Sequence, residues 1–216
     1  MNKHLARPLI AFDMGNVLLP FDHMTACRAV AEKTGVRAQT IYERLFNSGI
    51  EGAFETGELD EKQFLATCSN ALGVKLSVDW FRPAWCDIFR TDTRMEELVA
   101  ELRGRVDLCL VSNTNPWHFD YVQQRFGVLQ YFDHCVLSYL VGSMKPSKAM
   151  YEQAISVVAG PRVRLFIDDL EENVKAARSH GFEGIVFRGA EFLARHETIR
   201  DFLNSDDVNT VGGHRL

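Results

Sequence analysis

The chain has 216 residues, 46% of them hydrophobic and 25% charged, which suits a globular protein with one sizeable core and a smaller attached unit. Its formal net charge of −5 argues against binding to nucleic acid or to an anionic membrane, because both need a basic surface. The 15 Phe, 5 Tyr and 3 Trp argue against intrinsic disorder, and no apolar stretch approaches the roughly 20 residues of a membrane span.

Five short apolar runs predict buried strands of a parallel sheet, at residues 9–12, 106–111, 135–137, 165–167 and 184–187. Helical patterns separate these runs. Asn115-Pro116 and Ser147 mark two helix starts, and His180-Gly181 marks a helix end. Strands that alternate with helices predict the α/β class, with a doubly wound, Rossmann-like parallel sheet.

The segment after the first strand contains no credible strand and is too long for a simple crossover. Its patterns predict helices at residues 22–33 and 38–46, one opened by the Asp60/Gln63 pair, and one at residues 77–89 that Pro83 kinks or restarts. A Thr93/Glu96 capping box then opens the helix that returns to the sheet. We therefore predict an α/β core formed by residues 1–19 and 93–216, with an inserted helical cap at residues 20–92.

The five cysteines are scattered, odd in number and without a CxxC pair, so we expect buried thiols in a reducing cytoplasm. The early apolar run at residues 8–20 is interrupted by Asp13 and lacks a small-residue cleavage site, which argues against a signal peptide. These features predict a cytoplasmic protein. The terminal segments, residues 1–7 and 205–216, carry no recognised motif, and we expect them to be poorly ordered.

Polar clusters follow the predicted strands, at the edge of a doubly wound sheet where ligands bind. Asp13 ends the first strand and suits a rigidly held nucleophile, although a single Asp there is more often a turn or helix cap. Ser112-Asn113 precedes a helix and suits a phosphate site, although capping is the simpler role.

Two further clusters lie later in the chain. Lys145 is followed by a proline that restrains its backbone, although an isolated lysine is usually solvated. Asp168-Asp169 brings two carboxylates together, which suits Mg²⁺, although an exposed acidic turn is the simpler interpretation. The four clusters together favour a catalytic site far more than any one of them does.

The order and spacing of these motifs resemble those of the haloacid dehalogenase (HAD) superfamily, in the class with a small helical cap after the first strand. The resemblance runs from Leu9 to Arg188 and rests on Phe12-Asp13-Met14-Gly15-Asn16-Val17, Val111-Ser112-Asn113-Thr114, Gly142-Ser143-Met144-Lys145-Pro146 and Phe166-Ile167-Asp168-Asp169 with Glu172-Asn173. Residues 54–59 also resemble the cap loop of this class. Gly15-Asn16-Val17 resembles a bacterial branch of sugar-phosphate phosphatases that includes the α-D-glucose-1-phosphate phosphatases.

The resemblance implies a Mg²⁺-dependent phosphomonoester hydrolase that acts on a small phosphorylated metabolite through an aspartyl-phosphate. Asp13 would be the nucleophile. The Mg²⁺ ligands would be Asp13, the Gly15 carbonyl and Asp169, with Asp168 just outside them. Phosphate would be held by Ser112, the Asn113 backbone and Lys145, and Asn173 would order the acidic loop. The cap would close over the substrate and exclude water.

One position departs from the family pattern, because most phosphatases of the superfamily carry an acid/base Asp where this chain has Gly15. Such a group is worth about 10² to 10⁴-fold in rate. Candidate replacements are Asp22, His23 and His118. Without a replacement, we expect a preference for a leaving group that is already a fairly stable anion, such as that of a sugar 1-phosphate.

Two alternatives remain open. A 2-haloacid dehalogenase also uses a strand-end Asp and lacks the second Asp, but it needs no metal, and the Asp168-Asp169 pair argues for one. A non-catalytic phospholigand-binding protein would have no reason to keep all four clusters. Selectivity is expected in the cap, whose aromatic residues are expected to form its own core: Phe46, Phe54, Trp80, Phe81 and Trp85.

Overall fold

The computed structural model describes residues 7–158, 160 and 163–204, so the terminal segments 1–6 and 205–216 lie outside the described residues. Its sheet has five parallel strands in the order β3-β2-β1-β4-β5. The predicted doubly wound sheet is confirmed, and each strand end lies within one residue of its predicted place: β1 (Leu9–Phe12), β2 (Asp107–Ser112), β3 (His134–Leu137), β4 (Arg164–Asp168) and β5 (Glu183–Val186).

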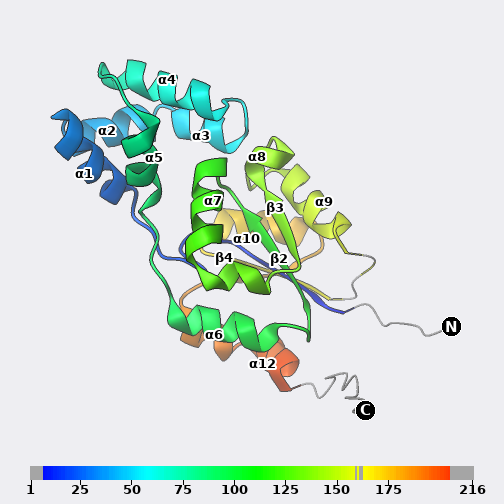
Figure 1. Ribbon diagram of the computed structural model, residues 1–216. Coiled ribbons are helices and arrows are strands. Elements are labelled where there is room, and N and C mark those ends of the chain that lie inside the picture. Colours follow the sequence, from blue (N-terminus) through cyan, green and yellow to red (C-terminus); the bar gives the residue numbers. More distant parts are fainter. Residues whose placement is uncertain (1–6, 159, 161–162, 205–216) are drawn as a thin grey trace, which may run out of the picture.

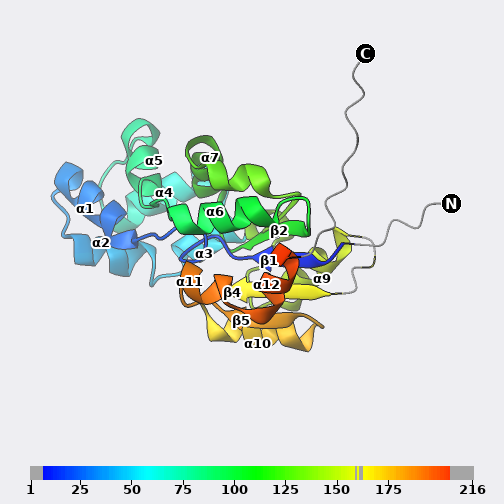
Figure 2. The ribbon, with the colours of Figure 1, turned by 90° about the horizontal axis from the view of Figure 1, so that it is seen from below.

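Helices cover both faces of the sheet (Figures 1 and 2), and alternating side chains of the strands pack against them. Ile10 and Phe12 belong to a cluster that includes residues of α6 (Thr93–Leu102), α11 (Ala190–Ala194) and α12 (Glu197–Asn204), among other elements. Leu9 and Ala11 pack on the opposite face, with α9 (Lys148–Ser156) and α10 (Glu171–Ser179). Burial on both faces explains why the central strands β1, β2 and β4 are almost entirely apolar instead of alternating.

Five helices follow β1 and enclose a second apolar cluster, at the carboxyl edge of the sheet (Figure 1). They are α1 (His23–Thr34), α2 (Ala38–Leu45), α3 (Ile50–Glu55), α4 (Glu61–Leu72) and α5 (Val78–Cys86). The expected aromatic core is confirmed, because Phe54, Phe81 and Trp85 are fully buried in this cluster while Phe46 and Trp80 pack at its margin. We keep the name cap for residues 20–92; the boundary itself stays a prediction.

Most helix ends follow their sequence signals. Asp60 and Gln63 form the predicted capping box, and the Asn115 side chain accepts a hydrogen bond from the His118 N–H at the start of α7 (Pro116–Arg125). The predicted Thr93 cap is wrong by one residue, because Asp92 accepts the capping bonds of α6.

The structure differs from three other expectations about local structure. Pro83 lies inside α5, which continues to Cys86, so the helix does not restart there. Four cysteines are buried as expected, but Cys135 is exposed on β3. Arg7, which we expected in a poorly ordered segment, pairs with Asp107.

Two helix pairs bring the cap against the core. Helix α5 packs against α7, whose Trp117 is buried among the cap aromatics. Helix α3 packs against the short α8 (Ser138–Val141). At that junction a Cβ on Gly57, which has φ +73°, would lie 2.6 Å from the Tyr139 carbonyl oxygen, so the glycine permits the close approach.

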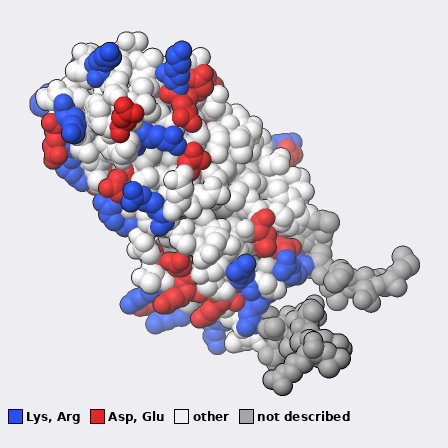
Figure 3. All heavy atoms as spheres, viewed as in Figure 1, with Lys and Arg blue, Asp and Glu red and all other residues white. Residues whose placement is uncertain are grey.

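Charges of both signs are interspersed on the face drawn in Figure 3, over the cap and over the lower part of the core. Among the described helices, none has the length and apolar character needed to cross a bilayer.

Candidate active site

The carboxylate of Asp13 is fixed at the carboxyl end of β1. The Asp13 N–H donates to the Ile167 carbonyl oxygen of β4 at 2.9 Å, which continues the sheet register by one residue. The Met14 N–H donates to Asp13 Oδ1 at 2.7 Å. The side chain retains 13% exposure, so a rigid strand presents a carboxylate that a ligand can still reach.

Lys145 lies between two of the predicted acidic residues. Its Nζ is 2.7 Å from Asp13 Oδ1 and 2.7 Å from Asp168 Oδ2, and its side chain is 1% exposed. The Asn113 side chain accepts from the Lys145 N–H at 2.7 Å and donates to the Lys145 carbonyl oxygen at 3.0 Å. Burial opposes the lysine charge, but the two carboxylates outweigh it and raise the pKa of Lys145. Lys145 is therefore not a solvated surface lysine.

Asp168 is fully buried and its oxygens are occupied by donors. Asn173 Nδ2 donates to both oxygens, at 3.0 and 3.1 Å, and the Leu170 N–H donates to Oδ1 at 2.9 Å. With the Lys145 ion pair, these bonds hold the acidic turn in one conformation. The alternative of an exposed acidic turn does not apply to Asp168.

The three carboxylates of Asp13, Asp168 and Asp169 form a compact group, in which each offers one oxygen that lies within 4.8 Å of the other two. Burial, opposed by Lys145 and reinforced by Asp168, raises the pKa of Asp13 to about 6. Burial and the Asp168 charge also raise the pKa of Asp169. One lysine does not balance three carboxylates, and hard oxygen donors in excess of positive charge fit a cation such as Mg²⁺.

Ser112 and Asn113 lie at the end of β2, beside the carboxylates rather than at the helix start. The buried Ser112 hydroxyl donates to the Asn113 carbonyl oxygen at 3.3 Å, and the Asn113 side chain is occupied by Lys145. Capping of α7 falls to Asn115. The structure thus brings together every predicted site residue from β1, β2, the segment before α9 and β4, while their individual roles stay predictions.

Gly15 lacks a side chain because the space is occupied. A Cβ on Gly15 would lie 2.5 Å from Cε1 of Phe21, whose ring packs against Phe89 and His23. The φ angle of Gly15 is outside the left-handed region, and the neighbouring Asn16 has φ 54° instead. The obstacle to an acid at this position is therefore steric.

Asp22 and His118, two of the candidate replacements for the missing acid, have structural partners. Asp22 caps α1 and pairs with Arg28, and the hydrogen bond from the Met24 N–H lowers its pKa. The ring nitrogens of buried His118 contact the Trp85 carbonyl oxygen at 3.1 Å and the Asn115 side chain at 3.0 Å, and burial lowers its pKa to about 3.

His23, the third expected replacement, stacks on Phe46, and its Nε2 lies 3.4 Å from Glu51 Oε1. Burial lowers its pKa to about 4, so the imidazole is neutral at pH 7 and holds no proton suited to release near neutral pH. None of the three therefore has both the position and the protonation state of a general acid.

Sequence reasoning missed Glu55, the last residue of α3. Burial, reinforced by the charge of Asp13 and opposed by Lys145, raises its pKa to about 7. The segment around it resembled a family cap loop, but its orientation toward Asp13 depends on how α3 packs against the core. No spacing in the sequence carries that information.

The sequence-family model of the haloacid dehalogenase-like hydrolases matches residues 8–181, which include all four motifs. The chain belongs to this family. The family-level resemblance drawn from the motifs is thus confirmed, while the finer resemblance to glucose-1-phosphate phosphatases stays a prediction.

Two curated relatives of this HAD-like hydrolase are named as phosphatases. A D-ribitol-5-phosphate phosphatase of Bacteroides thetaiotaomicron is 27% identical, over 81% of this chain and 88% of the relative. A sesquiterpene phosphatase of Aspergillus oryzae is 25% identical, over 81% of this chain and 86% of the relative.

A HAD family enzyme of B. thetaiotaomicron, crystallised with magnesium and inorganic phosphate, has a TM-score of 0.74 and is 27% identical. That alignment covers 85% of this chain and 94% of the other. The L-2-haloacid dehalogenase of Xanthobacter autotrophicus shares the fold, with a TM-score of 0.60 and 18% identity. That alignment covers 87% of this chain and 80% of the dehalogenase.

Proposed function

We propose that this HAD-like hydrolase is a Mg²⁺-dependent phosphomonoester hydrolase that acts through an aspartyl-phosphate on Asp13. The observation that carries the proposal is the position of Lys145 Nζ, 2.7 Å from both Asp13 and Asp168, beside a third carboxylate at Asp169. A nucleophile, a fixed positive charge and a set of hard oxygen ligands are the parts that phosphoryl transfer requires.

The hydrogen bonds of Asp13 leave one oxygen for attack. Oδ1 accepts from Lys145 and from the Met14 N–H, and Oδ2 accepts no hydrogen bond from a described residue. Attack on phosphorus forms the aspartyl-phosphate and releases the alcohol, which takes up a proton. Water then cleaves the acyl phosphate and regenerates the carboxylate, so one difficult displacement becomes two easier ones.

The phosphate oxygens would be held by Ser112, the Asn113 backbone and Lys145. Lys145 can do this because Asn113 fixes its backbone and Asp168 fixes its ammonium group. A positive charge held in place before the reaction stabilises charge on the equatorial oxygens without reorganisation. Asn173 supports this arrangement indirectly, by holding both oxygens of Asp168.

The residues that would hold Mg²⁺ are Asp13, the Gly15 carbonyl and Asp169. Asp168 is occupied by Lys145, Asn173 and the Leu170 N–H, which keeps it just outside this set. When bound, the ion neutralises negative charge between nucleophile and phosphate. The magnesium and phosphate in the crystals of the B. thetaiotaomicron enzyme support the assignment.

The substrate that fits best is a small phosphorylated sugar or polyol, a class to which the substrate named for the D-ribitol-5-phosphate relative belongs. Within that class, the sugar 1-phosphate is the form expected if no residue replaces the acid missing at Gly15. That finer proposal depends on the source of the proton, which a comparison of matched 1- and 6-phosphates tests.

A panel of phosphorylated metabolites, assayed for phosphate release with Mg²⁺ and with EDTA, tests the proposed function. We expect turnover of sugar or polyol phosphates that EDTA abolishes and added Mg²⁺ restores. A 2-haloacid belongs in the panel, because halide release in excess EDTA would favour the dehalogenase alternative. Binding of phosphorylated compounds without turnover of any of them would favour the non-catalytic alternative.

A further inference from the structure

The departing alcohol needs a proton that residue 15 cannot supply. The ring of Phe21 occupies the space that a side chain there would need, and the three acids expected from the sequence have other partners or no available proton. A donor must therefore come from another element that faces Asp13. The cap is the part of the molecule at that edge of the sheet (Figure 1).

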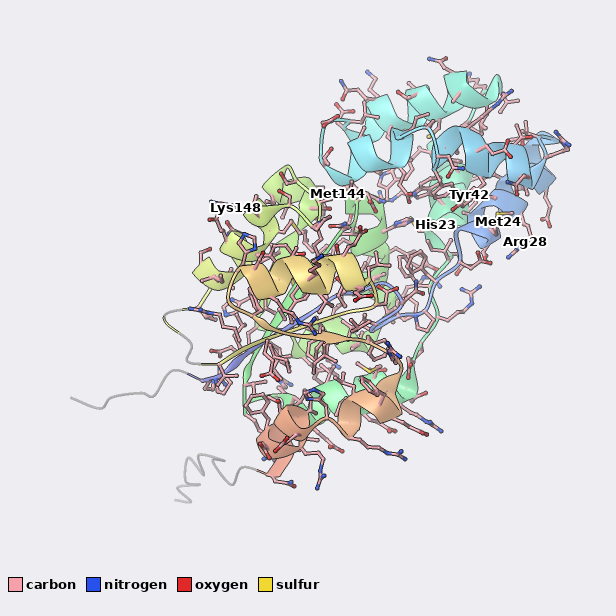
Figure 4. The ribbon with its side chains drawn as sticks, turned by 180° about the vertical axis from the view of Figure 1, so that it is seen from behind. His23, Met24, Arg28, Tyr42, Met144 and Lys148 are labelled. Atoms are coloured by element: carbon pink, nitrogen blue, oxygen red, sulfur yellow. The ribbon has the colours of Figure 1, made fainter. Side chains whose placement is uncertain are left out.

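The orientation of α3 directs Glu55 toward the core. Gly52 lies three residues earlier and so on the same side of the helix, and a Cβ there would lie 3.7 Å from Cε of Met144, the neighbour of Lys145. Phe54 instead packs inside the cap against Phe64, with ring centroids 4.1 Å apart. Figure 4 labels Met144 on the core, below the cap helices, and His23 at the start of the cap.

The carboxyl group of Glu55 is uncommitted. It has no hydrogen bond or ion pair with any residue in the described part of the chain, although it is half-buried and interacts electrostatically with Asp13 and Lys145. A half-buried carboxyl group without a partner is costly to keep, so a functional role is a better account than a structural one. Asp13 is also an electrostatic neighbour of this carboxyl group.

We propose that Glu55 donates the proton to the departing alcohol oxygen and then accepts one from the water that hydrolyses the aspartyl-phosphate. In the first step the P–O bond to the alcohol breaks as the Asp13–phosphorus bond forms, and the Glu55 proton goes to the alcohol. In the second, water adds to phosphorus, its proton goes to Glu55, and Asp13 is released. This assignment rests on the proposed function and names the acid/base for it.

The charges around Glu55 suit this role. Asp13 of the β1 end and Lys145 of the core face it, Glu51 lies one turn earlier on the same helix, and neutral His23 lies beyond Glu51. Burial, reinforced by the charge of Asp13 and opposed by Lys145, raises the pKa of Glu55 to about 7. A raised pKa favours the protonated carboxyl group that proton donation requires.

The proposal changes the expected selectivity. With a proton available from Glu55, an ordinary sugar alkoxide no longer has to leave unprotonated. The wild-type enzyme should then hydrolyse glucose 6-phosphate about as well as glucose 1-phosphate. Because Glu55 lies on the cap, the proton donor is in place only when the cap is seated on the core.

The test compares Glu55→Gln with Glu58→Gln, a matched change at an exposed position in the same cap segment. The value of kcat/KM is measured for glucose 6-phosphate, glucose 1-phosphate and p-nitrophenyl phosphate across pH 5–9. General acid catalysis is worth about 10² to 10⁴-fold, so Glu55→Gln should lose at least about 100-fold on the 6-phosphate and less than about tenfold on p-nitrophenyl phosphate. Glu58→Gln should behave as wild type.

Three further readouts separate proton transfer from a structural role. Activity of the wild type on the 6-phosphate should fall as the pH rises within this range, because the protonated acid is lost, and Glu55→Gln should lack this limb. The ratio of 1-phosphate to 6-phosphate hydrolysis should be at least tenfold higher for Glu55→Gln than for wild type. Steady turnover of p-nitrophenyl phosphate should follow a burst, because the base for the second step is missing.

Equal losses on all three substrates, an unchanged pH limb, or no loss on the 6-phosphate would overturn the assignment. If Glu55→Gln does not fold, Glu55→Ala with added formate replaces it, and failure of formate to restore 6-phosphate hydrolysis counts against Glu55. A wild type inactive on every phosphate tested would instead overturn the proposed function itself.

Discussion

Replacing Lys145 by Met tests the charge balance of the site, because Met preserves most of the length and removes the ammonium group. Two carboxylates, Asp13 and Asp168, each lose a partner at 2.7 Å in surroundings where the lysine side chain is 1% exposed. Breaking a buried ion pair by removing one partner costs about 3–5 kcal/mol. For a chain of this size, about 2–4 °C per kcal/mol predicts a fall in Tm of about 6–20 °C.

The matched control is Lys148→Met, three residues later. Lys148 pairs with Glu152 at 2.9 Å, but its side chain is 69% exposed, and such pairs contribute about 0.3–0.5 kcal/mol. Urea unfolding of the metal-free proteins at pH 8 should therefore separate the two variants by several kcal/mol. Circular dichroism before unfolding checks that both begin folded.

The pH dependence of the unfolding free energy provides a second, independent test of the Lys145→Met prediction. The pKa of Asp13 is already raised to about 6 with the lysine present, and removal of the lysine raises it further. Protonation removes the repulsion between the unpaired carboxylates. The difference in unfolding free energy between wild type and Lys145→Met should therefore narrow as the pH falls from 8 to 5. A loss below about 1 kcal/mol at pH 8, or a gap that is the same at both pH values, would refute the reasoning.

Three other predictions follow from the same geometry. Gly15→Asp should lose about 1–3 kcal/mol of unfolding free energy through overpacking against Phe21 and should gain no activity. The same change should cost less in a Phe21→Ala background, measured as a double-mutant cycle, and a stable single variant with faster turnover of alkyl phosphates would contradict the steric account. Glu55→Gln should raise the Tm of the metal-free protein at pH 8 but not at pH 4, because a folded-state pKa of about 7, above the ordinary value, costs stability once the pH exceeds the ordinary value; a lower Tm at pH 8 would refute this. Asp169→Ala should abolish phosphate release at ordinary Mg²⁺ concentrations, and activity that is unaffected by the change would remove Asp169 from the ligand set.

The strands and the site edge could be predicted from sequence because their signals are local. The central strands β1, β2 and β4 are buried on both faces and are therefore almost entirely apolar. Asp13, Ser112-Asn113 and Asp168-Asp169 lie where these three strands stop, whereas Lys145 follows β3 only after the short α8. Parallel strands bring their carboxyl ends to one edge, so Asp13, Ser112 and Asp168 had to be neighbours. Helix ends were predictable where a side chain caps them, as Asn115 does.

The features that were missed depend on contacts between distant segments. Helix α3 has only six residues, and its N-cap residue, Gly49, has no side chain to cap it. The sequence therefore carries no signal for the start of this helix. The orientation of Glu55 toward Asp13 depends on the contact of α3 with the core. The steric role of Phe21 at Gly15 depends on the path of the chain between β1 and the cap, which no residue spacing encodes.

Trapping the covalent intermediate tests the central claim most directly. Enzyme incubated with Mg²⁺ and p-nitrophenyl phosphate is quenched in acid, digested and examined by mass spectrometry. We predict a peptide carrying one phosphoryl group on Asp13, labile to hydroxylamine as an acyl phosphate is, and absent from Asp13→Asn, which should also have lost turnover while keeping its fold. Phosphate release without any phosphorylated Asp13 peptide, or normal turnover by Asp13→Asn, would contradict the account.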